Sequence, residues 1–321
     1  MSAESQVRGR LAVVIGDPNG IGPEIALRAA LALLALPNAL HPVLVGDRHV
    51  IEGTANALGL APDWRGRVGL HDVAALAPAD WQPGTVSAAA GAATVAYVRA
   101  AVDLAQQGQV AAIVAAPHSE TAVNAAGIAF SGYSGLVADL TGTPRDHACL
   151  MLEAQGLRVV HTTVHERLAD ALARLTPELV AQAARSAQAT LQRMGVDNPV
   201  VCLLGINPHA GEGGLFGADD QRVNEPALAM LRAEGLNVIG PIGADLALAE
   251  RRHDVYVAMY HDQGHIAVKM LSPKGATAVV AGVPVLFASV GHGAAFDIAG
   301  KGCADASAMI ETAKTLARMS T

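Results

Sequence analysis

LAVVIGDPNGIGPEIALRAALALLA, residues 11–35, contains a strand-like run, a glycine-rich turn and a helix-like run in direct succession. Leu11–Gly16 is short and apolar, as expected for a buried strand, whereas residues 22–35 are rich in alanine and leucine, which favour helices. Strands that alternate with helices predict an α/β fold whose mostly parallel sheet is covered on both faces and binds ligands at the carboxyl ends of its strands. The same alternation recurs along the chain, with strands expected at 41–47, 110–117, 156–165, 199–211 and 255–258 and helices at 92–107, at 176–195 and from 304 onward.

The composition fits such a fold and excludes several classes of protein. The chain has 321 residues, of which 51% are hydrophobic and 16% are charged, and its formal net charge is -7. Because a typical domain has about 150 residues, two domains are expected. An acidic chain without a basic cluster has no general attraction for nucleic acid or for anionic membranes, so neither is an expected partner.

No stretch of the sequence is typical of a targeting or membrane segment. The apolar run before Gly16 is too short for a signal-peptide core. The long uncharged stretch 275–296 is interrupted by glycine, proline, serine and threonine, which predicts two strands and a turn. The widely spaced Cys149, Cys202 and Cys303 are expected to be buried free thiols in a reducing compartment. These features predict a cytoplasmic protein.

Three histidines occupy the same kind of position, just after a predicted strand. His165 ends VVHTTVH, His209 lies in NPHAG, and His261 follows VYVAMY within the unusually polar run YHDQGHIAVK. Because strand ends meet at one edge of a parallel sheet, the three imidazoles could converge on a divalent cation with positions left open for a substrate. The alternative is that each histidine caps or hydrogen-bonds locally.

Four further features have both a functional and a structural interpretation. The turn Gly16–Ile25 could point helix N–H groups at a ligand or serve only as a tight connection. The loop 291–310 could wrap an adenosine, with Asp297 accepting from ribose hydroxyls, or be an ordinary glycine-rich connection. Lys269 could hold a substrate carboxylate or move a proton, or be a solvated surface residue. Asp245 could orient a ligand or cap a helix.

Taken together, GDPNGIGPE, NPHAGEGG, MYHDQGH and GHGAAFDIAGKGCAD resemble, in order and over nearly the whole chain, the motifs of the 4-hydroxythreonine-4-phosphate dehydrogenase (PdxA) family. That family is similar in fold to isocitrate and isopropylmalate dehydrogenases. The resemblance implies two α/β domains that share a mostly parallel sheet core, with an active-site cleft between them. The expected domains are residues 1–130 plus 265–321, with the nucleotide-binding loop, and residues 131–264, with the metal ligands and the dimer interface.

The resemblance also implies the site residues and partners. His165, His209 and His261 would be the metal ligands, with Lys269 and Asp245 as catalytic residues that line the site. NAD or NADP would be the cofactor, bound by a loop whose residues are Gly291, His292, Gly293, Asp297 and Gly300. A homodimer with the active site at the subunit interface is expected. Imidazole ligands suit Zn, Co, Ni or Mn better than Mg.

The chain departs from the biosynthetic branch of that family where the substrate phosphate would lie. Tyr133 and Ser134 replace a His-Thr pair, Phe287 stands where that branch has an arginine, and Ser119-Glu120 replace a His-Lys pair. Loss of the arginine removes a charge-assisted hydrogen bond worth roughly 1.5–3 kcal/mol. Tyr133, Ser134, Lys269 and Phe287 are therefore expected to bind a substrate without a phosphate.

The same departures closely resemble the terephthalate dihydrodiol dehydrogenase branch. The expected reaction is oxidation of a secondary alcohol followed by decarboxylation of the β-keto acid, which converts 1,2-dihydroxy-3,5-cyclohexadiene-1,4-dicarboxylate to 3,4-dihydroxybenzoate and CO2. One alternative substrate is 4-phosphooxy-L-threonine or a related phosphorylated four-carbon sugar acid. An alternative of a different class is an inactive sensor that binds metal and nucleotide without turnover.

Overall fold

The computed structural model describes residues 9–36, 40–273 and 275–319, and it divides into two compact units. Unit 1 comprises residues 1–142 and 284–321, and unit 2 comprises residues 143–283. The sequence predicted bounds of 1–130 plus 265–321 and of 131–264. In the structure residues 131–142 belong to unit 1 and residues 265–283 to unit 2. The reason is local packing, because the helix that begins at His261 lies on strands of unit 2 and the strand Thr277–Ala281 pairs with Cys149–Ala154.

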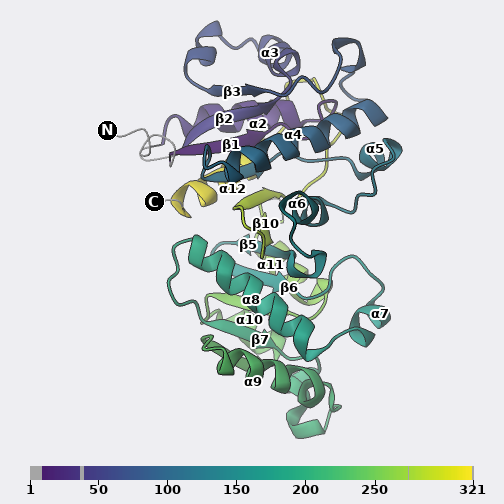
Figure 1. Cartoon of the computed structure of the whole chain (residues 1–321), viewed down its shortest axis with the longest axis vertical. Helices are drawn as coiled ribbons and strands as arrows, with labels where there is room; N and C mark the ends of the chain where they lie inside the picture. The colour runs from purple at the N-terminus through teal and green to yellow at the C-terminus, as the bar shows by residue number, and fades with distance from the viewer. Residues whose placement is uncertain (1–8, 37–39, 274, 320–321) are drawn as a thin grey trace. The chain divides into compact units, whose positions relative to one another are not determined.

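Unit 1 is a parallel sheet with helices. Its strands are β1 (Arg10–Val14), β2 (His41–Gly46), β3 (Gly69–Asp72), β4 (Ala112–Ala115) and β11 (Phe287–Val290), in the order β3-β2-β1-β4-β11. Its helices are α2 (Gly22–Leu33), α3 (Arg48–Ala57), α4 (Ala88–Gln106), α5 (Glu120–Ala125), α6 (Tyr133–Thr141) and α12 (Ser307–Met319), with short 3-10 turns at Pro62–Gly66 and Pro78–Asp80. Figure 1 shows α4 crossing the strands, which it contacts at β1, β2 and β4.

Helix α4 is the one described helix that is long and apolar enough to cross a membrane by length and composition. Just over half of its most apolar window is buried inside the protein. The core helix of a globular protein passes the same test, so α4 is weak evidence for a membrane span.

Unit 2 contains the predicted metal ligands and a mixed sheet. Its strands are β5 (Cys149–Ala154), β6 (Leu157–His161), β7 (Val201–Leu204), β8 (Val238–Ile242), β9 (Val255–Ala258) and β10 (Thr277–Ala281), in the order β10-β5-β6-β9-β7-β8. Its helices are α7 (Leu168–Ala173), α8 (Pro177–Arg193), α9 (Glu225–Ala233), α10 (Ala244–Glu250) and α11 (His261–Leu271), with short turns at Arg145–His147, Pro208–Gly214 and Asp220–Asn224. Helix α8 lies across this sheet and begins where predicted, since the Thr176 hydroxyl accepts from the backbone N–H of Leu179.

The predicted α/β fold with mostly parallel strands is confirmed, with one antiparallel exception. β6, β9, β7 and β8 are parallel neighbours, whereas β5 is antiparallel to both β6 and β10. β5 and β6 are joined by Gln155 and Gly156, both at positive φ. A two-residue turn of this kind matches the twist of an antiparallel pair, so it dictates the direction of β5. The stretch 275–296 forms two strands, as predicted, and Cys303 is exposed, contrary to expectation.

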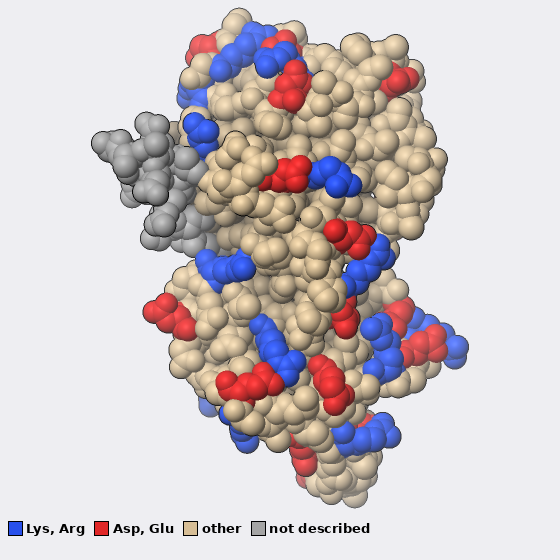
Figure 2. Space-filling model, in the orientation of Figure 1, with Lys and Arg blue, Asp and Glu red and all other residues tan. Residues whose placement is uncertain are grey.

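Surface charges of both signs are interspersed. Figure 2 shows lysine and arginine side chains lying beside aspartate and glutamate side chains on the visible face. Several of these neighbours form ion pairs, such as Arg185 with Glu234 at 2.6 Å and Arg174 with Glu166 at 2.7 Å. Mixed charges of this kind create no strong field of one sign.

The glycine-rich turn after β1 buries an acidic side chain. Asp17 is 0% exposed, one of its carboxylate oxygens accepts from the Asn19 N–H at 2.9 Å, and its Oδ2 has no hydrogen-bond partner among the described residues. Burial raises the pKa of Asp17 from 3.8 to about 6. Because the folded-state pKa lies above the unfolded one, protonation stabilises the fold, and this contribution is lost as the pH rises through about 6.

We therefore expect Asp17→Asn to stabilise the protein in a pH-dependent way. The asparagine retains an acceptor for the Asn19 N–H and replaces a buried charge by a neutral amide. The free energy of unfolding should rise by about 1–3 kcal/mol above pH 7, and the gain should vanish below about pH 4. Urea denaturation of both proteins across this pH range would check the expectation, and a gain independent of pH would contradict it.

Candidate functional site

Strand β9 and helix α11 meet at the polar run that begins with His261. The Gln263 side chain links the ends of β9 and β7. Its Oε1 accepts from the Met259 N–H at 2.7 Å, and its Nε2 donates to the Gly205 carbonyl at 2.8 Å. Residues four apart lie on one face of a helix, so α11 presents His261, His265 and Lys269 together. This explains the concentration of ionisable groups just past a buried strand.

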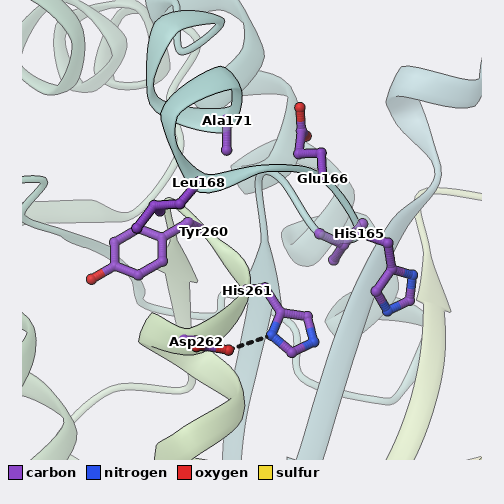
Figure 3. Close-up of a pocket in the computed structure, with 8 residues that line it drawn as sticks. His165, Glu166, Leu168, Ala171, Tyr260, His261 and Asp262 are labelled. Atoms are coloured by element: carbon purple, nitrogen blue, oxygen red, sulfur yellow. Dashed lines mark hydrogen bonds and ion pairs between the residues drawn. The ribbon is translucent and has the colours of Figure 1, made fainter.

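His165 and His261 lie side by side in a pocket of unit 2. Their ring centroids are 5.6 Å apart, and the pocket has a volume of about 310 Å³ and is lined by residues 164–166, 168, 171 and 260–262. His165 is exposed and His261 is half-buried. Figure 3 shows the two rings on the same side of the pocket, with Asp262 bonded to the His261 ring and Glu166 turned away from both.

A second layer of histidines lies behind His261. The rings of His261 and His265 are stacked with centroids 3.5 Å apart and planes at 12°, and His265 in turn hydrogen-bonds His161. Burial, reinforced by neighbouring histidines, lowers the pKa of His161 to about 3 and that of His265 to about 4. Both side chains are therefore neutral at physiological pH.

His209 lies in a left-handed loop after β7. Six consecutive residues, His209–Gly214, have positive φ, and three of them are not glycine. A non-glycine residue in this region costs of order 1–3 kcal/mol, and such strain gathers at functional sites. The His209 side chain is 66% exposed, so the loop presents it to solvent.

The structure brings His209 together with two carboxylates. His209 Nδ1 lies 2.8 Å from Glu212 Oε2, and this hydrogen bond raises the pKa of His209. The negative charge of Asp245 raises the same pKa further. Gly243 lies next to both the Asp245 carboxylate and the His209 backbone, because a Cβ placed there would be 3.1 Å from Asp245 Oδ1 and 3.5 Å from His209 Cα. Asp245, near the start of α10, therefore lies beside the His209 loop, and its role in the site stays a prediction.

The three predicted metal ligands thus fall into two groups within unit 2. One group, the His261 cluster, comprises His165, His261, His265 and Lys269. The other, the His209 loop, comprises His209, Glu212 and Asp245. Across the described ranges of the chain, no group of three or more His, Cys, Asp or Glu side chains is arranged to hold a metal ion.

The chemistry of the donors nevertheless fits a metal. A metal-bound histidine almost always donates its other ring N–H to a carboxylate or carbonyl, which orients the ring. His261 Nδ1 is 2.7 Å from Asp262 Oδ1, and His209 Nδ1 is 2.8 Å from Glu212 Oε2. Both arrangements leave Nε2 available as the ligand atom. The residues present therefore suit a divalent ion with nitrogen ligands.

The predicted cofactor loop lies in unit 1 against the glycine-rich turn. The Ala294 carbonyl accepts from the Ile21 N–H at 2.9 Å, and a Cβ at Gly20 would collide with Ala294. A pocket of about 330 Å³ beside this contact is lined by Pro18, Gly20, Trp81 and Gly300 among others. The other predicted cofactor residues lie along the same loop; Gly291, Gly293 and Asp297 are exposed and His292 is half-buried.

The residues predicted to bind substrate in unit 1 are arranged in a chain of aromatic contacts. Tyr133 packs edge-on against His118 and Phe287, with ring centroids 4.3 and 5.3 Å away, and Phe130 packs on His118. Phe287 is 0% exposed and Tyr133 5%, so in this structure both rings are buried, with Phe287 packed against Tyr133. The Tyr133 hydroxyl donates to the Ala116 carbonyl at 2.7 Å.

The remaining departures from the biosynthetic branch have separate positions. Ser119 caps α5 by accepting from the Ala122 N–H, while Glu120 is exposed in the first turn of that helix. Ser134 is half-buried at the start of α6. Burial lowers the pKa of His118 to about 4, so the aromatic group of His118, Phe130, Tyr133 and Phe287 is uncharged.

From the sequence, His118, His161 and His265 are expected to be surface or supporting groups. The only local signal for His265 was its four-residue spacing from His261 and Lys269, which places all three on one helical face. No local signal existed for the contact of His161 with His265, because the two residues lie 104 positions apart in the sequence.

Comparison with known proteins gives a consistent result. Residues 38–316 match the family model described as pyridoxal phosphate biosynthetic protein PdxA. The 1,2-dihydroxy-3,5-cyclohexadiene-1,4-dicarboxylate dehydrogenase of Comamonas sp is 46% identical over 306 residues, covering 95% of this chain and 96% of that protein.

Two crystal structures match over nearly the whole chain. A terephthalate 1,2-cis-dihydrodiol dehydrogenase from Burkholderia xenovorans is 48% identical with a TM-score of 0.72, covering 94% of this chain and 97% of the other. A 4-hydroxythreonine-4-phosphate dehydrogenase from Klebsiella pneumoniae is 33% identical with a TM-score of 0.86. The match covers 97% of this chain and 98% of the other.

Proposed function

This chain belongs to the PdxA family, whose named relatives are dehydrogenases, and we propose that it is a metal- and NAD(P)-dependent oxidative decarboxylase. The favoured substrate is 1,2-dihydroxy-3,5-cyclohexadiene-1,4-dicarboxylate, and the products are 3,4-dihydroxybenzoate and CO2. The proposal extends to this chain the activity that names its relative from Comamonas sp.

The observation that best supports this substrate is the uncharged aromatic group in unit 1. His118, Phe130, Tyr133 and Phe287 pack on one another, and burial keeps His118 neutral. A phosphate ester needs cationic partners such as arginine, which bind it through charge-assisted hydrogen bonds. A planar ring is better matched to aromatic side chains. Direct contact of Tyr133 and Ser134 with the substrate stays a prediction, and the role we propose for Phe287 is to support Tyr133.

The reaction balances without a further co-reactant. The hydride at C2 passes to the nicotinamide and the C2 hydroxyl loses its proton, which leaves a ketone β to the C1 carboxylate. The C1–carboxylate bond then breaks, CO2 leaves, and the bonding electron pair moves toward the ketone oxygen. The resulting enol completes an aromatic ring, which drives the second step.

The residues of unit 2 supply binding and proton transfer. His165, His209 and His261 hold the divalent ion, which, when bound, supplies Lewis-acid polarisation of a substrate oxygen. Lys269, on the same face of α11, pairs with a substrate carboxylate or moves a proton. Asp245 lies beside His209 and orients the substrate there.

We further propose that the two groups of ligands meet in a homodimer. The His261 cluster of one chain and the His209 loop of its partner each offer imidazoles whose Nδ1 is held by a carboxylate. Exposed apolar side chains at Leu215 and Phe216 follow His209 in the same loop, which suits an interface. A cytoplasmic location, the choice between NAD and NADP, and the identity of the metal stay predictions.

A second candidate is oxidation of 4-phosphooxy-L-threonine or a related phosphorylated sugar acid, which the similarity to the Klebsiella pneumoniae enzyme favours. An inactive metal- and nucleotide-binding sensor is the alternative of a different class. Turnover separates a sensor from both enzymes.

The proposal predicts the stoichiometry of the reaction. Zinc- or manganese-loaded protein, given the dihydrodiol and NAD or NADP, should release reduced nicotinamide, CO2 and 3,4-dihydroxybenzoate in equal amounts. Absorbance, carbon dioxide trapping and chromatography measure the three products, and His261→Ala is the matched control. Reduced nicotinamide without CO2 would contradict decarboxylation, and no turnover of any candidate substrate would favour the sensor.

A further inference from the structure

His161 and His265 form a hydrogen-bonded pair that the proposed reaction does not yet use. His161 ends β6 and is 1% exposed, and its Nε2 lies 3.0 Å from Nδ1 of the half-buried His265. A Cβ at Gly264 would collide with His161 Nε2, so only glycine lets α11 approach β6 this closely. The close approach and the hydrogen bond together hold a buried imidazole, His161, against a half-buried one, His265.

The hydrogen bonds fix the tautomer of both rings. His161 Nδ1 lies 3.1 Å from the Leu150 carbonyl oxygen, which can only accept, so this nitrogen carries the proton and His161 Nε2 is an acceptor. His265 Nδ1 must then donate to His161 Nε2. The His261 carbonyl, 3.2 Å from His265 Nδ1, requires the same proton on the same nitrogen. His265 Nε2 is therefore left with a lone pair.

The lone pair lies on the side of His265 away from the buried strand. The two nitrogens of an imidazole point to different sides of the ring. With His265 Nδ1 turned toward His161, His265 Nε2 faces away from His161. No hydrogen-bond partner for His265 Nε2 is found among the residues that the structure describes. Parallel stacking on His261 at 3.5 Å and 12° keeps the two rings from converging on one ion, so His265 is suited to accept a hydrogen bond beside the predicted ligands.

We propose that His265 is a substrate-contacting residue whose Nε2 accepts a hydrogen bond from a hydroxyl group of the bound diol, and that His161 is the positioning residue that holds it in this tautomer. The proposal rests on the dehydrogenase function proposed above. It assigns the diol's recognition in part to an imidazole nitrogen that accepts a hydrogen bond, which distinguishes a hydroxyl donor from a phosphate or carboxylate acceptor.

The tautomer can be tested without metal, cofactor or substrate. Nitrogen-15 correlation spectra of the full-length, histidine-labelled protein report which ring nitrogen carries the proton. The expected result is a proton on Nδ1 and none on Nε2 of His265, assigned by comparison with the His265→Gln variant. A proton on Nε2 of His265 in the wild-type protein would overturn the proposal, whatever the protein catalyses.

Matched variants test the contact with the substrate. His265→Leu should raise the KM for the dihydrodiol about tenfold, which is the effect of one hydrogen bond, and change kcat by less than about threefold. His265→Gln should restore most of the lost affinity, because its amide can donate to His161 and its oxygen can accept. His161→Leu, if it folds, should raise the KM by a smaller factor, because His265 then samples both tautomers.

The outcomes separate this proposal from the proposed function. Metal content, measured for every variant, shows whether His261 still binds its ion. An unchanged KM in His265→Leu, with normal turnover by the wild-type protein, would overturn the role of His265 alone. Failure of the wild-type protein to oxidise the dihydrodiol would overturn the proposed function and this contact together, whereas the spectra would still report the tautomer.

Discussion

His209→Ala is expected to lose its bound metal and its activity together while remaining folded. The side chain is 66% exposed and contacts the exposed Phe216 and Glu212, so its removal should leave the core of unit 2 intact. Loss of one of three protein ligands should lower the rate by at least about 1,000-fold, because both the ion and its Lewis acidity are lost. Elemental analysis, circular dichroism and the rate of nicotinamide reduction measure the three quantities.

Two further variants calibrate this result. Glu212→Ala removes only the carboxylate at His209 Nδ1, for which a loss of about 10- to 100-fold in metal affinity is expected. His41→Ala removes an exposed histidine of unit 1 and should change nothing. Normal metal content and turnover in His209→Ala would disprove the ligand assignment.

A mixture of two inactive variants tests whether each site is shared by two chains. His209→Ala and His261→Ala each lack a ligand at every site when alone. If His209 comes from the partner, a hybrid dimer of the two variants has one complete site and one site that lacks both ligands. With random pairing half of the dimers are hybrids, so a co-expressed mixture should recover about a quarter of wild-type activity. No recovery would mean that all three ligands come from one chain.

The second large effect is expected in substrate preference. We expect kcat/KM for the dihydrodiol to exceed that for 4-phosphooxy-threonine by at least about 100-fold, since a lost arginine contact alone is worth about 10- to 150-fold. Repulsion of the phosphate dianion by the exposed Glu120 would add to this difference. Initial rates with both substrates and the same metal-loaded protein provide the comparison. A preference for the phosphate ester would mean that other cations replace the arginine.

Paired variants of Tyr133 test whether its ring contributes to the preference. Tyr133→Phe loses the hydrogen bond to Ala116 and retains the ring that packs between His118 and Phe287. It should stay within about threefold of wild-type kcat/KM, whereas Tyr133→Leu should fall about tenfold, the value of an aromatic contact. Equal losses in both variants would assign the effect to the lost hydroxyl and its hydrogen bond to Ala116, and not to the ring.

Several features of this protein could be predicted from local sequence patterns. Alternating apolar strands and alanine-rich helices indicated the α/β fold, and Thr176 marked the start of α8 by its capping oxygen. His165, His209 and His261 were each recognised by their place after a strand. The predictions of the fold and of the helix start succeed because periodicity and capping depend on residues within one or two turns of each other, whereas the ligand role of the three histidines stays a prediction.

Other features depended on contacts between distant segments. Only the folded chain shows that His161 meets His265 across 104 residues, that Phe287 packs edge-on against Tyr133, and that His209 stands apart from the His261 cluster. A periodic pattern reports which face of an element is buried, but it does not report which side chain of another element is opposite. That choice is made by strand order, register and close approaches such as the one at Gly264, which arise only when the whole unit packs.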